Sequence, residues 1–477
     1  MIYTSFFQKF GKLYFRGRKP DGTRIQFSDR DLKPTLYVKG PGKYKNIYGD
    51  MLHAKEFDSI KLARDFIKDY GSSLSIHGNS AFEYDFIHRQ FNEEIDASID
   101  QLSVCIIDIE TTAENGQIDT ERTPEKVLLI TCSDMKGKMV TFGFQPSSAP
   151  NYINCGSEEQ LLQKFIEYIV ETDPDIISGW NSTYFDIAYL GSRITKLLGS
   201  RALDRLSPFG IVEKKIDKIL DREQLRWDIA GRIQLDLLDL YKKFRLINRP
   251  KYKLDYIGQI EVGERKLESE YKRFSDRYKH DWENFVLYNQ QDVRLVEKLE
   301  NKLGFIYLAV SLAYMCKVNF DDVFSPIKLW ENYIKHTLLS RNLFIELKKR
   351  SNGSDDSIVG GYVSQPDQGM YKWVVTFDAA SLYPSIIMAL NMSPETLKRP
   401  TDLTIEKLLE ESGVDRTDTS LCYAANGSTY SKDSVGILAE LTEIVFNRRK
   451  TAKNGMLAAK NEMQLIQAEL KKRGIDV

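Results

Sequence analysis

Histidine and cysteine are scarce in this sequence, and those present form no recognisable motif. The five cysteines, at positions 105, 132, 155, 316 and 422, include no CxxC pair. This scatter disfavours a zinc site or a disulfide framework and suits a reducing cytoplasm. The five histidines belong to no catalytic pattern, so a histidine-based active site is disfavoured as well.

Long apolar runs and an excess of charge are also lacking. No run approaches the ~18 apolar residues that span a bilayer, and the N-terminus lacks a secretory signal pattern. We therefore expect a cytoplasmic protein with no membrane partner. The net charge is −1, so no global basic field indicates nucleic acid. Acids gathered in metal sites and bases gathered along a groove would cancel in that total.

The length of 477 residues favours about three domains. Residues 1–102 alternate apolar and polar positions in short runs, which predicts strands, with a helix near 60–70. Two buried strands, Val104–Glu110 and Val127–Cys132, then precede helical periodicity at 157–171, 183–198 and 281–302. This mixture predicts an α/β domain from about 103 to 308.

The remaining third of the chain divides at a polar, turn-rich stretch at 350–357. Residues 309–350 before it have a helical pattern. After it, Trp373–Asp378 reads as an apolar strand. From Gly436 onward the pattern is helical and highly charged, with a break expected near Asn454–Gly455.

Acidic residues at particular spacings suggest the first site. Asp108 and Glu110 lie two apart on a predicted strand, so both project from one face. Asp186 follows the turn Gly179-Trp-Asn-Ser-Thr-Tyr-Phe, and Tyr288 and Asp292 share a helix face at i and i+4. Taken singly, each has a simpler interpretation as a solvated strand end, a first-turn acid or a surface pair. Together they are far more specific.

This combination resembles the three exonuclease motifs of the DEDDy class of 3′–5′ exonucleases, as found in family B DNA polymerases. The resemblance implies a ribonuclease-H-like domain in which Asp108, Glu110, Asp186 and Asp292 hold two divalent metal ions, with Mg²⁺ favoured and Mn²⁺ as the other candidate. It also implies that Tyr288 orients the attacking water. Asn181 and Phe185 would contact the frayed 3′ end of single-stranded DNA.

A second set of residues begins with Asp378-Ala-Ala-Ser-Leu-Tyr-Pro-Ser-Ile386. Taken alone, this could be a capped strand-to-helix turn, because Asp and Ser favour such positions. Its length and unusual composition give it a closer resemblance to motif A of family B DNA polymerases. The resemblance implies that Asp378 and the carbonyl of Ala379 bind metal, and that Leu382 and Tyr383 lie beneath the deoxyribose.

Further blocks extend the resemblance over nearly the whole chain. Ile358-Val-Gly-Gly-Tyr matches the YxGG region with Ile358 in place of Tyr, and Gly360 and Gly361 would permit close approach to a template phosphate. Arg448 aligns with the arginine that grips the incoming nucleoside triphosphate, assisted by Lys450 or Lys453. Other blocks, such as Ser325–Trp330, resemble the T-even phage branch of the family. That branch implies a hairpin near 211–235 that separates primer from template.

The implied fold is α/β and α+β multidomain. An N-terminal mixed β domain would comprise residues 1–102 with a return segment at 309–351, and the exonuclease domain would comprise 103–308. A partial palm would follow at 352–437 and a partial helical fingers at 438–477.

The family's KxxxNSxYG and DTD motifs do not occur after Asp378. We therefore expect the N-terminal subunit of a split replicative polymerase, or a truncated one, in a bacterial host cytoplasm if phage-encoded. A second chain would supply those motifs and the sliding-clamp contact, and primer–template DNA and deoxynucleoside triphosphates would be the substrates. A stand-alone 3′–5′ DNA exonuclease and a non-catalytic DNA- or RNA-binding fragment are the alternatives.

Overall fold

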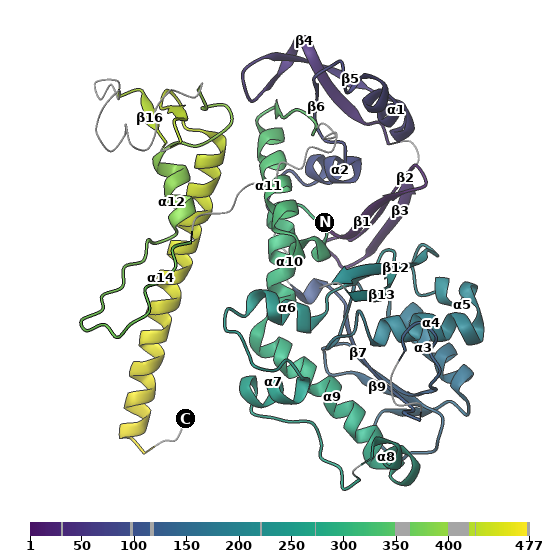
Figure 1. Ribbon diagram of the computed structural model, residues 1–477. Helices are drawn as coiled ribbons and strands as arrows, with labels where there is room; N and C mark the ends of the chain where they lie inside the picture. The colour runs from purple at the N-terminus through teal and green to yellow at the C-terminus, as the bar shows by residue number, and fades with distance from the viewer. Residues whose placement is uncertain are drawn as a thin grey trace. The chain divides into compact units, whose positions relative to one another are not determined.

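The computed structural model describes the chain except for residues 30–31, 96–98, 115–118, 220–221, 272, 349–362, 399–418, 425 and 475–477. The chain forms two compact units (Figure 1). The first comprises Met1–Tyr44 and Met51–Leu347, and the second comprises Lys45–Asp50 and Lys348–Val477. The mixed α/β class is confirmed, whereas the finer boundaries at 102 and 308 stay predictions. None of the helices in the described ranges is both long and apolar enough to cross a membrane.

The N-terminal part of the first unit is built on two small sheets. An antiparallel three-stranded sheet has the order β1-β2-β3, and a four-stranded sheet has the order β15-β4-β5 with β6 paired to β4. The predicted helix near 60–70 is present as α1. The elements are β1 (Ile2–Lys9), β2 (Lys12–Arg18), β3 (Arg24–Asp29), β4 (Thr35–Asn46), β5 (Met51–Glu56), α1 (Ile60–Tyr70), β6 (Ile76–His77), α2 (Phe82–Gln90), η1 (Ile99–Gln101) and β15 (Leu343–Phe344).

A six-stranded sheet with the order β10-β9-β8-β7-β11-β14 forms the centre of the first unit. β8 is antiparallel to both β7 and β9, whereas β11 is parallel to β7 and β14. The strands are β7 (Val104–Thr111), β8 (Val127–Ser133), β9 (Met139–Gly143), β10 (Tyr152–Asn154), β11 (Ile176–Ser178) and β14 (Ile233–Gln234).

Helices cover the sheet because its strands are apolar on both faces. Cys105, Ile107 and Ile109 of β7 pack in a core with α3 (Glu158–Thr172) and α4 (Asp186–Leu198). Val104 and Ile106, on the alternate positions, pack in another core with α9 (Trp282–Leu303). Asp108 and Glu110 occupy the next two alternate positions, so they lie on the same face of β7 as Val104 and Ile106. The three helices predicted from periodicity are therefore present.

The other helices of the first unit are α5 (Ser200–Asp204), α6 (Leu237–Phe244), α7 (Leu254–Glu261), α8 (Phe274–His280), α10 (Phe305–Cys316), η2 (Phe320–Phe324) and α11 (Pro326–Ser340). The stretch 309–350, for which a helical pattern was predicted, thus also contains strand β15. A hairpin of β12 (Val212–Ile219) and β13 (Arg222–Ile229) matches the one expected near 211–235.

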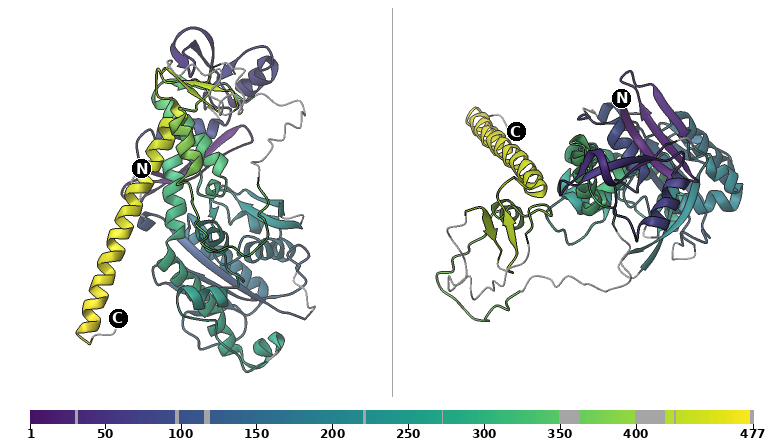
Figure 2. Two further views of the ribbon diagram at one scale, coloured as in Figure 1. Left: turned by 60° about the vertical axis from the view of Figure 1, so that its left-hand side comes forward. Right: turned by 90° about the horizontal axis from the view of Figure 1, so that it is seen from above.

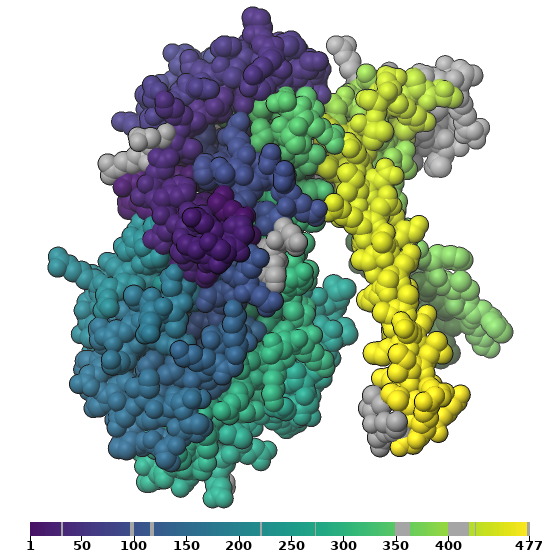
Figure 3. Space-filling view, turned by 180° about the vertical axis from the view of Figure 1, so that it is seen from behind, coloured from purple at the N-terminus to yellow at the C-terminus, as the bar shows by residue number. Residues whose placement is uncertain are grey.

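In the second unit the described elements are α12 (Leu382–Ala389), the pair β16 (Leu421–Tyr423) and β17 (Thr429–Ser431), and α14 (Ile437–Lys472). The break predicted at Asn454–Gly455 is wrong, because α14 continues through it. An interior glycine costs only about 1 kcal/mol relative to alanine, and this helix is rich in Ala, Leu, Glu, Lys and Met. Every described side chain from 447 to 469 is exposed (yellow in Figure 3).

The strand predicted at Trp373–Asp378 is wrong as well, because residues 374–378 have no regular secondary structure. Trp373 and Phe377 are 95% and 90% exposed. A strand needs a neighbour to receive its backbone hydrogen bonds, and no described residue pairs with this segment. The apolar pattern was correct for a strand, but the pairing partner is missing from the described part of the chain.

A buried ion-pair cluster joins the small β1-β2-β3 sheet to the central sheet. The Asp175 carboxylate is fully buried and accepts two hydrogen bonds from Arg18, at 3.0 and 2.8 Å, and another from Arg24. It also accepts the backbone N–H of Ser103 at 2.9 Å. Asp175 directly precedes β11, and Ser103 directly precedes β7, so this one side chain aligns the start of both strands.

We predict that Asp175→Ala lowers the free energy of unfolding of the first unit by roughly 1.5–3 kcal/mol, because it removes a buried carboxylate that pairs with the partly exposed guanidinium groups of Arg18 and Arg24, of which Arg24 keeps its ion pair with Asp173. Urea unfolding followed by tryptophan fluorescence measures this. As the control, Lys164→Ala removes an ion pair between exposed side chains and should change the stability by less than about 0.5 kcal/mol. Equal effects of the two substitutions would contradict the prediction.

Candidate active site

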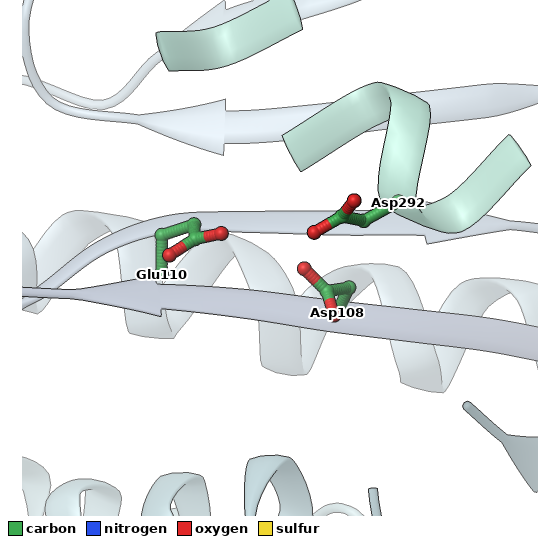
Figure 4. A group of neighbouring side chains, drawn as sticks. All are labelled: Asp108, Glu110 and Asp292. Atoms are coloured by element: carbon green, nitrogen blue, oxygen red, sulfur yellow. The ribbon is translucent and has the colours of Figure 1, made fainter. Parts of the chain in front are cut away.

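Carboxylates from three elements of the first unit converge at the end of β7. Asp108 and Glu110 come from β7, Asp186 is the first residue of α4, and Asp292 lies in the middle of α9. Figure 4 shows the side chains of Asp108, Glu110 and Asp292 turned toward one another. One carboxylate oxygen of each lies within 4.8 Å of the others, close enough for a single cation to bind all three.

Asparagine 289 fixes the orientation of Asp108. Its Nδ2 donates to Asp108 Oδ2 at 2.6 Å, and its Oδ1 accepts a hydrogen bond from the hydroxyl of Thr131 on β8. Asn289 is fully buried, three residues before Asp292 on the same face of α9. The sequence analysis missed this residue, and the polar pair Asn289-Gln290 within an apolar helix face is the signal that could have revealed it.

A tight turn positions Asp186. Adding a Cβ atom to Gly179 would bring it to 2.6 Å from the carbonyl oxygen of Ile107, so only glycine permits this approach to β7. The buried Asp236 accepts the N–H groups of Asn181 and Thr183, both at 3.0 Å. The turn places Asp186 so that its Oδ1 accepts the N–H of Ile109 at 2.9 Å. Ile109 is the residue between Asp108 and Glu110 on β7. Asp186 does not belong to the three-carboxylate group, although it lies beside it.

Lysine 266, which the sequence analysis also missed, is the one basic side chain bonded to these acids in the described residues. Its Nζ donates to Asp292 Oδ2 at 2.5 Å and to the Tyr288 hydroxyl at 3.1 Å. Burial alone would lower the pKa of Lys266, but Asp292 and Asp108 raise it, so the ammonium stays charged. Lys266 occurs in an irregular charged stretch, and no spacing in the sequence distinguishes it.

Desolvation raises the pKa values of all four acids, and other acids of the group raise those of Asp108 and Glu110 further. Burial, and then repulsion from Asp186, raises the pKa of Asp108 well above its usual value. Burial and Asp292 raise that of Glu110 to about 8. Burial raises the pKa of Asp186 to about 7 and that of Asp292 to about 6, the latter despite Lys266. Four carboxylates facing one ammonium therefore resist ionisation unless further positive charge is bound.

The residues fit a divalent cation. Asp292 Oδ1 is buried and has no hydrogen-bond partner within the described part of the chain, which is costly for a carboxylate oxygen. A cation among Asp108, Glu110 and Asp292 would satisfy that oxygen and lower the repulsion. An all-oxygen ligand set suits Mg²⁺ or Mn²⁺.

The remaining predicted residues of this site lie beside the acids. Tyr288 is one turn before Asp292 on α9, and burial together with Asp292 raises the pKa of its hydroxyl to about 12. Asn181 is exposed, with a φ of 67° in the turn. Phe185 is partly buried against Tyr189, with ring centroids 6.5 Å apart.

Among the described residues of the second unit, the predicted polymerase residues form no comparable cluster. Asp378 and Ala379 are exposed, and Asp378 belongs to no metal-holding group among the described residues. Leu382 and Tyr383 begin α12 and are 50% and 77% exposed. Gly360 and Gly361 lie outside the described residues.

The register of α14 separates the predicted triphosphate-binding residues. Arg448, Lys450 and Lys453 are all exposed. At about 100° per residue, Lys450 and Lys453 lie about 60° apart around the helix, whereas Arg448 lies about 140° from Lys453. Arg449, which the sequence analysis did not select, is four residues before Lys453 and shares its face.

We predict that, in EDTA, wild-type protein loses more thermal stability than Glu110→Gln as the pH rises from about 5 to about 8. The Glu110 carboxyl keeps its proton to about pH 8 in the folded chain but ionises near about 4.3 when unfolded. The folded state thus holds the extra proton in this window, and stability falls as the pH rises. Scanning fluorimetry measures the melting temperature.

Glu159→Gln, at an exposed position of α3, is the matched control and should retain the wild-type pH slope. Adding Mg²⁺ should raise the wild-type melting temperature more at the higher pH, because a cation binds the ionised carboxylates. Identical slopes for wild type and Glu110→Gln would show that this carboxyl is not protonated in the fold.

Comparison with known proteins gives matches along most of the chain. The model of the DNA polymerase family B exonuclease domain matches residues 73–257, and the model of DNA polymerase family B matches residues 331–475. The DNA-directed DNA polymerase of Escherichia phage RB69 is 29% identical over 94% of this chain and 53% of its own length. That of Enterobacteria phage T4 is 28% identical over 91% of this chain and 51% of its own length.

A DNA polymerase of Thermococcus gorgonarius is 26% identical over 96% of this chain and 56% of its own length. The chain therefore spans about half the length of the relatives it matches. The first match contains Asp108, Glu110 and Asp186, and the second contains Asp378 and α14, while Asp292 lies between the two matched ranges. The chain belongs to DNA polymerase family B.

Proposed function

We propose that the first unit removes nucleotides from the 3′ end of DNA by metal-dependent hydrolysis, as a proofreading exonuclease. The observation that carries this proposal is the convergence of Asp108, Glu110 and Asp292, together with the buried Oδ1 of Asp292, which has no hydrogen-bond partner in the described residues. The match to the family's exonuclease domain supports it.

Each residue has a role that follows from its position. Asp108, Glu110, Asp186 and Asp292 would hold two divalent cations, which supply Lewis-acid activation of water and neutralise charge on the departing 3′ oxygen. The Tyr288 hydroxyl, held by Lys266, orients the attacking water. Lys266 also keeps Asp292 ionised, which a metal ligand requires.

The DNA end is bound by the turn that precedes α4. Asn181 offers an exposed amide to the sugar or base, and Phe185 offers a ring for stacking. Tyr184, which lies between Asn181 and Phe185 in the chain, donates to Asp217 of the β12-β13 hairpin at 3.1 Å. Asp217 also accepts from Arg226 of β13 at 2.8 Å. The hairpin is thus coupled to the DNA-binding turn, which supports a role in separating primer from template.

We predict that Asp108→Asn and Asp292→Asn each lower the rate of 3′-end degradation of a 5′-labelled single strand by at least about 100-fold, because each removes an anionic ligand. Lys266→Ala should lower it by roughly 10- to 100-fold through its contact with Asp292. Denaturing gels resolve the products.

Asp119→Asn, which changes an acid outside the site, serves as the matched control and should leave the rate unchanged. If Asp108→Asn combined with Asp292→Asn degraded DNA at the wild-type rate, this assignment of the site would be wrong.

We further propose that the second unit contributes half of a nucleotide-adding site. Asp378 and the carbonyl of Ala379 would bind metal, and Leu382 and Tyr383 would lie beneath the deoxyribose. Arg449 and Lys450 each share a helix face with Lys453, at four and three residues' separation, which favours them for the triphosphate, whereas Arg448 lies about 140° from Lys453. The match of residues 331–475 to the family model supports this assignment.

DNA synthesis needs a second metal-binding aspartate, which the family carries in its DTD motif. That motif does not occur after Asp378. It also needs the lysine of KxxxNSxYG. We propose that further polypeptide supplies both, as well as contact with a sliding clamp. The exposed apolar segment Trp373–Phe377, which has no strand partner in the described residues, supports pairing with such a polypeptide.

We predict that residues 1–477 with Mg²⁺ and deoxynucleoside triphosphates do not extend a primer, and that adding a polypeptide with the two motifs restores extension. Asp378→Asn should then reduce extension by at least about 100-fold and leave 3′-end degradation intact. Primer-extension gels measure both activities.

Extension by residues 1–477 alone would contradict the half-site proposal. Normal extension by Asp378→Asn with its complement would instead favour a dedicated exonuclease.

A further inference from the structure

An arginine of α8 lies beside the acids of the first unit with part of its guanidinium unsatisfied. The Cζ atom of Arg277 is 5.6 Å from the centroid of the Tyr288 ring, and Lys266 Nζ is 5.1 Å from the same centroid. The Nε of Arg277 is buried and has no hydrogen-bond partner in the described part of the chain. A buried donor without an acceptor is costly. The side chain as a whole is partly exposed, so a ligand can reach it.

Two lysines near Arg277 have acidic partners, whereas Arg277 does not. Lys266 pairs with Asp292, and Lys279, two residues after Arg277, pairs with Glu114 at 3.2 Å. Arg277 forms no ion pair with any acid among the described residues. The sequence analysis did not select it, because nothing in the charged stretch 273–281 distinguishes one basic residue from another. Its positive charge is therefore available for an anion that binds at this site.

Arg277 is close to the carboxylates as well as to Tyr288. Burial and Asp292 raise the pKa of Glu110, whereas Lys266 and Arg277 lower it. A positive charge has this effect on a carboxyl group only from a short distance. The guanidinium therefore lies within range of the acids that would hold the cations of the proposed exonuclease.

Packing between two helices places Arg277 beside Tyr288. α8 packs against α9, the helix that carries Tyr288 (Figures 1 and 2). Phe274 and Tyr278 of α8 contact Phe285 of α9, with ring centroids 5.6 and 5.9 Å apart. Tyr278 and Phe285 are both buried. Because Arg277 directly precedes Tyr278, this apolar contact anchors its backbone while its side chain extends to Tyr288.

The hydrolysis proposed above increases the negative charge on one phosphate. The hydroxyl of water bonds to phosphorus, the bond from phosphorus to the 3′ oxygen breaks, and the other proton of the water ends on that oxygen. The terminal nucleotide leaves as a 5′-monophosphate. A phosphate monoester carries about −1.5 to −2 charges at pH 7, whereas the diester carries a single negative charge. A cation that binds this phosphate therefore stabilises the product and the transition state more than the substrate.

A guanidinium suits such a phosphate, because its planar fork of N–H donors can bind two oxygens of one phosphate group. We propose that Arg277 is a catalytic residue that binds the non-bridging oxygens of the phosphate under attack, and then the 5′-phosphate of the released nucleotide. Tyr288, which orients the attacking water in the proposed function, contacts the same guanidinium. This inference rests on the exonuclease function proposed above.

The first test measures steady-state degradation of a 5′-labelled single strand by the full chain with Mg²⁺. Arg277→Ala should lower kcat by at least about 10-fold, because it removes a donor to developing charge, and should change the KM for the strand less. Arg277→Lys should recover part of the rate, since lysine supplies the charge without the fork. Arg201→Ala, which removes an exposed arginine of α5, is the matched control and should keep the wild-type kcat and KM.

A second test measures affinity for the product instead of the rate. Thymidine 5′-monophosphate and thymidine are compared as competitive inhibitors of the same degradation. Arg277→Ala should weaken inhibition by the monophosphate by about 10-fold or more and leave inhibition by thymidine unchanged, because only the monophosphate carries the group that Arg277 binds. Scanning fluorimetry compares the melting temperatures of the variants. If Arg277→Ala is unstable, Arg277→Gln, which keeps a long polar side chain without the charge, provides the same comparison.

The outcomes separate this inference from the proposed function. If Asp108→Asn combined with Asp292→Asn degrades DNA at the wild-type rate, the exonuclease site itself is wrongly assigned. If that double variant is inactive but Arg277→Ala keeps the wild-type kcat, the role of Arg277 fails and the exonuclease assignment stands. A lowered kcat with an unchanged preference for the monophosphate over thymidine would also overturn the inference, because Arg277 would then support Tyr288 without binding phosphate.

Discussion

Repulsion among closely spaced carboxylates is the constraint around which the first unit is organised. Asp108, Glu110, Asp186 and Asp292 lie at the end of an apolar sheet, with Asp186 and Asp292 buried and Asp108 and Glu110 partly exposed. Desolvation raises the pKa of all four, and repulsion from other members of the group raises those of Asp108 and Glu110 further. The surrounding structure opposes this repulsion with the Lys266 ammonium, the Asn289 amide and the N–H of Ile109. Those contacts leave one oxygen of Asp292 without a hydrogen-bond partner among the described residues, and a divalent cation would supply one.

The second unit does not share this constraint. Asp378 is exposed and belongs to no acidic cluster among the described residues, so nothing in its surroundings demands a cation. Nearby, Trp373 and Phe377 expose large apolar side chains without a strand partner in the described part of the chain. The tightly bonded part of this unit is instead the base of α14, where Asn391, Ser393 and Glu395 accept three successive N–H groups. The first unit therefore gathers several acids into one group, whereas the described part of the second unit presents Asp378 without other acids beside it.

Much of the first unit could be predicted because its signals are local. Period-two alternation placed Asp108 and Glu110 on one face of β7, and helical periodicity located α3, α4 and α9. Local signals were misleading in the second unit. The apolar run at 373–378 has the composition of a strand but no pairing partner, and Asn454-Gly455 has the composition of a break inside a helix that continues. In both places the secondary structure depends on interactions with residues outside the short window from which it was predicted.

The sequence by itself determined which acids are available and on which elements they lie, because side-chain periodicity follows from backbone geometry alone. Only the tertiary structure decided which polar groups meet them. Lys266 reaches Asp292 across 26 residues, Asn289 reaches Asp108 across 181, and Glu395 reaches the start of α14 across 42. Contacts between residues so distant in the chain depend on how the sheet and helices pack, and no spacing in the sequence encodes them. The acids could therefore be predicted, whereas the groups that hold and neutralise them could not.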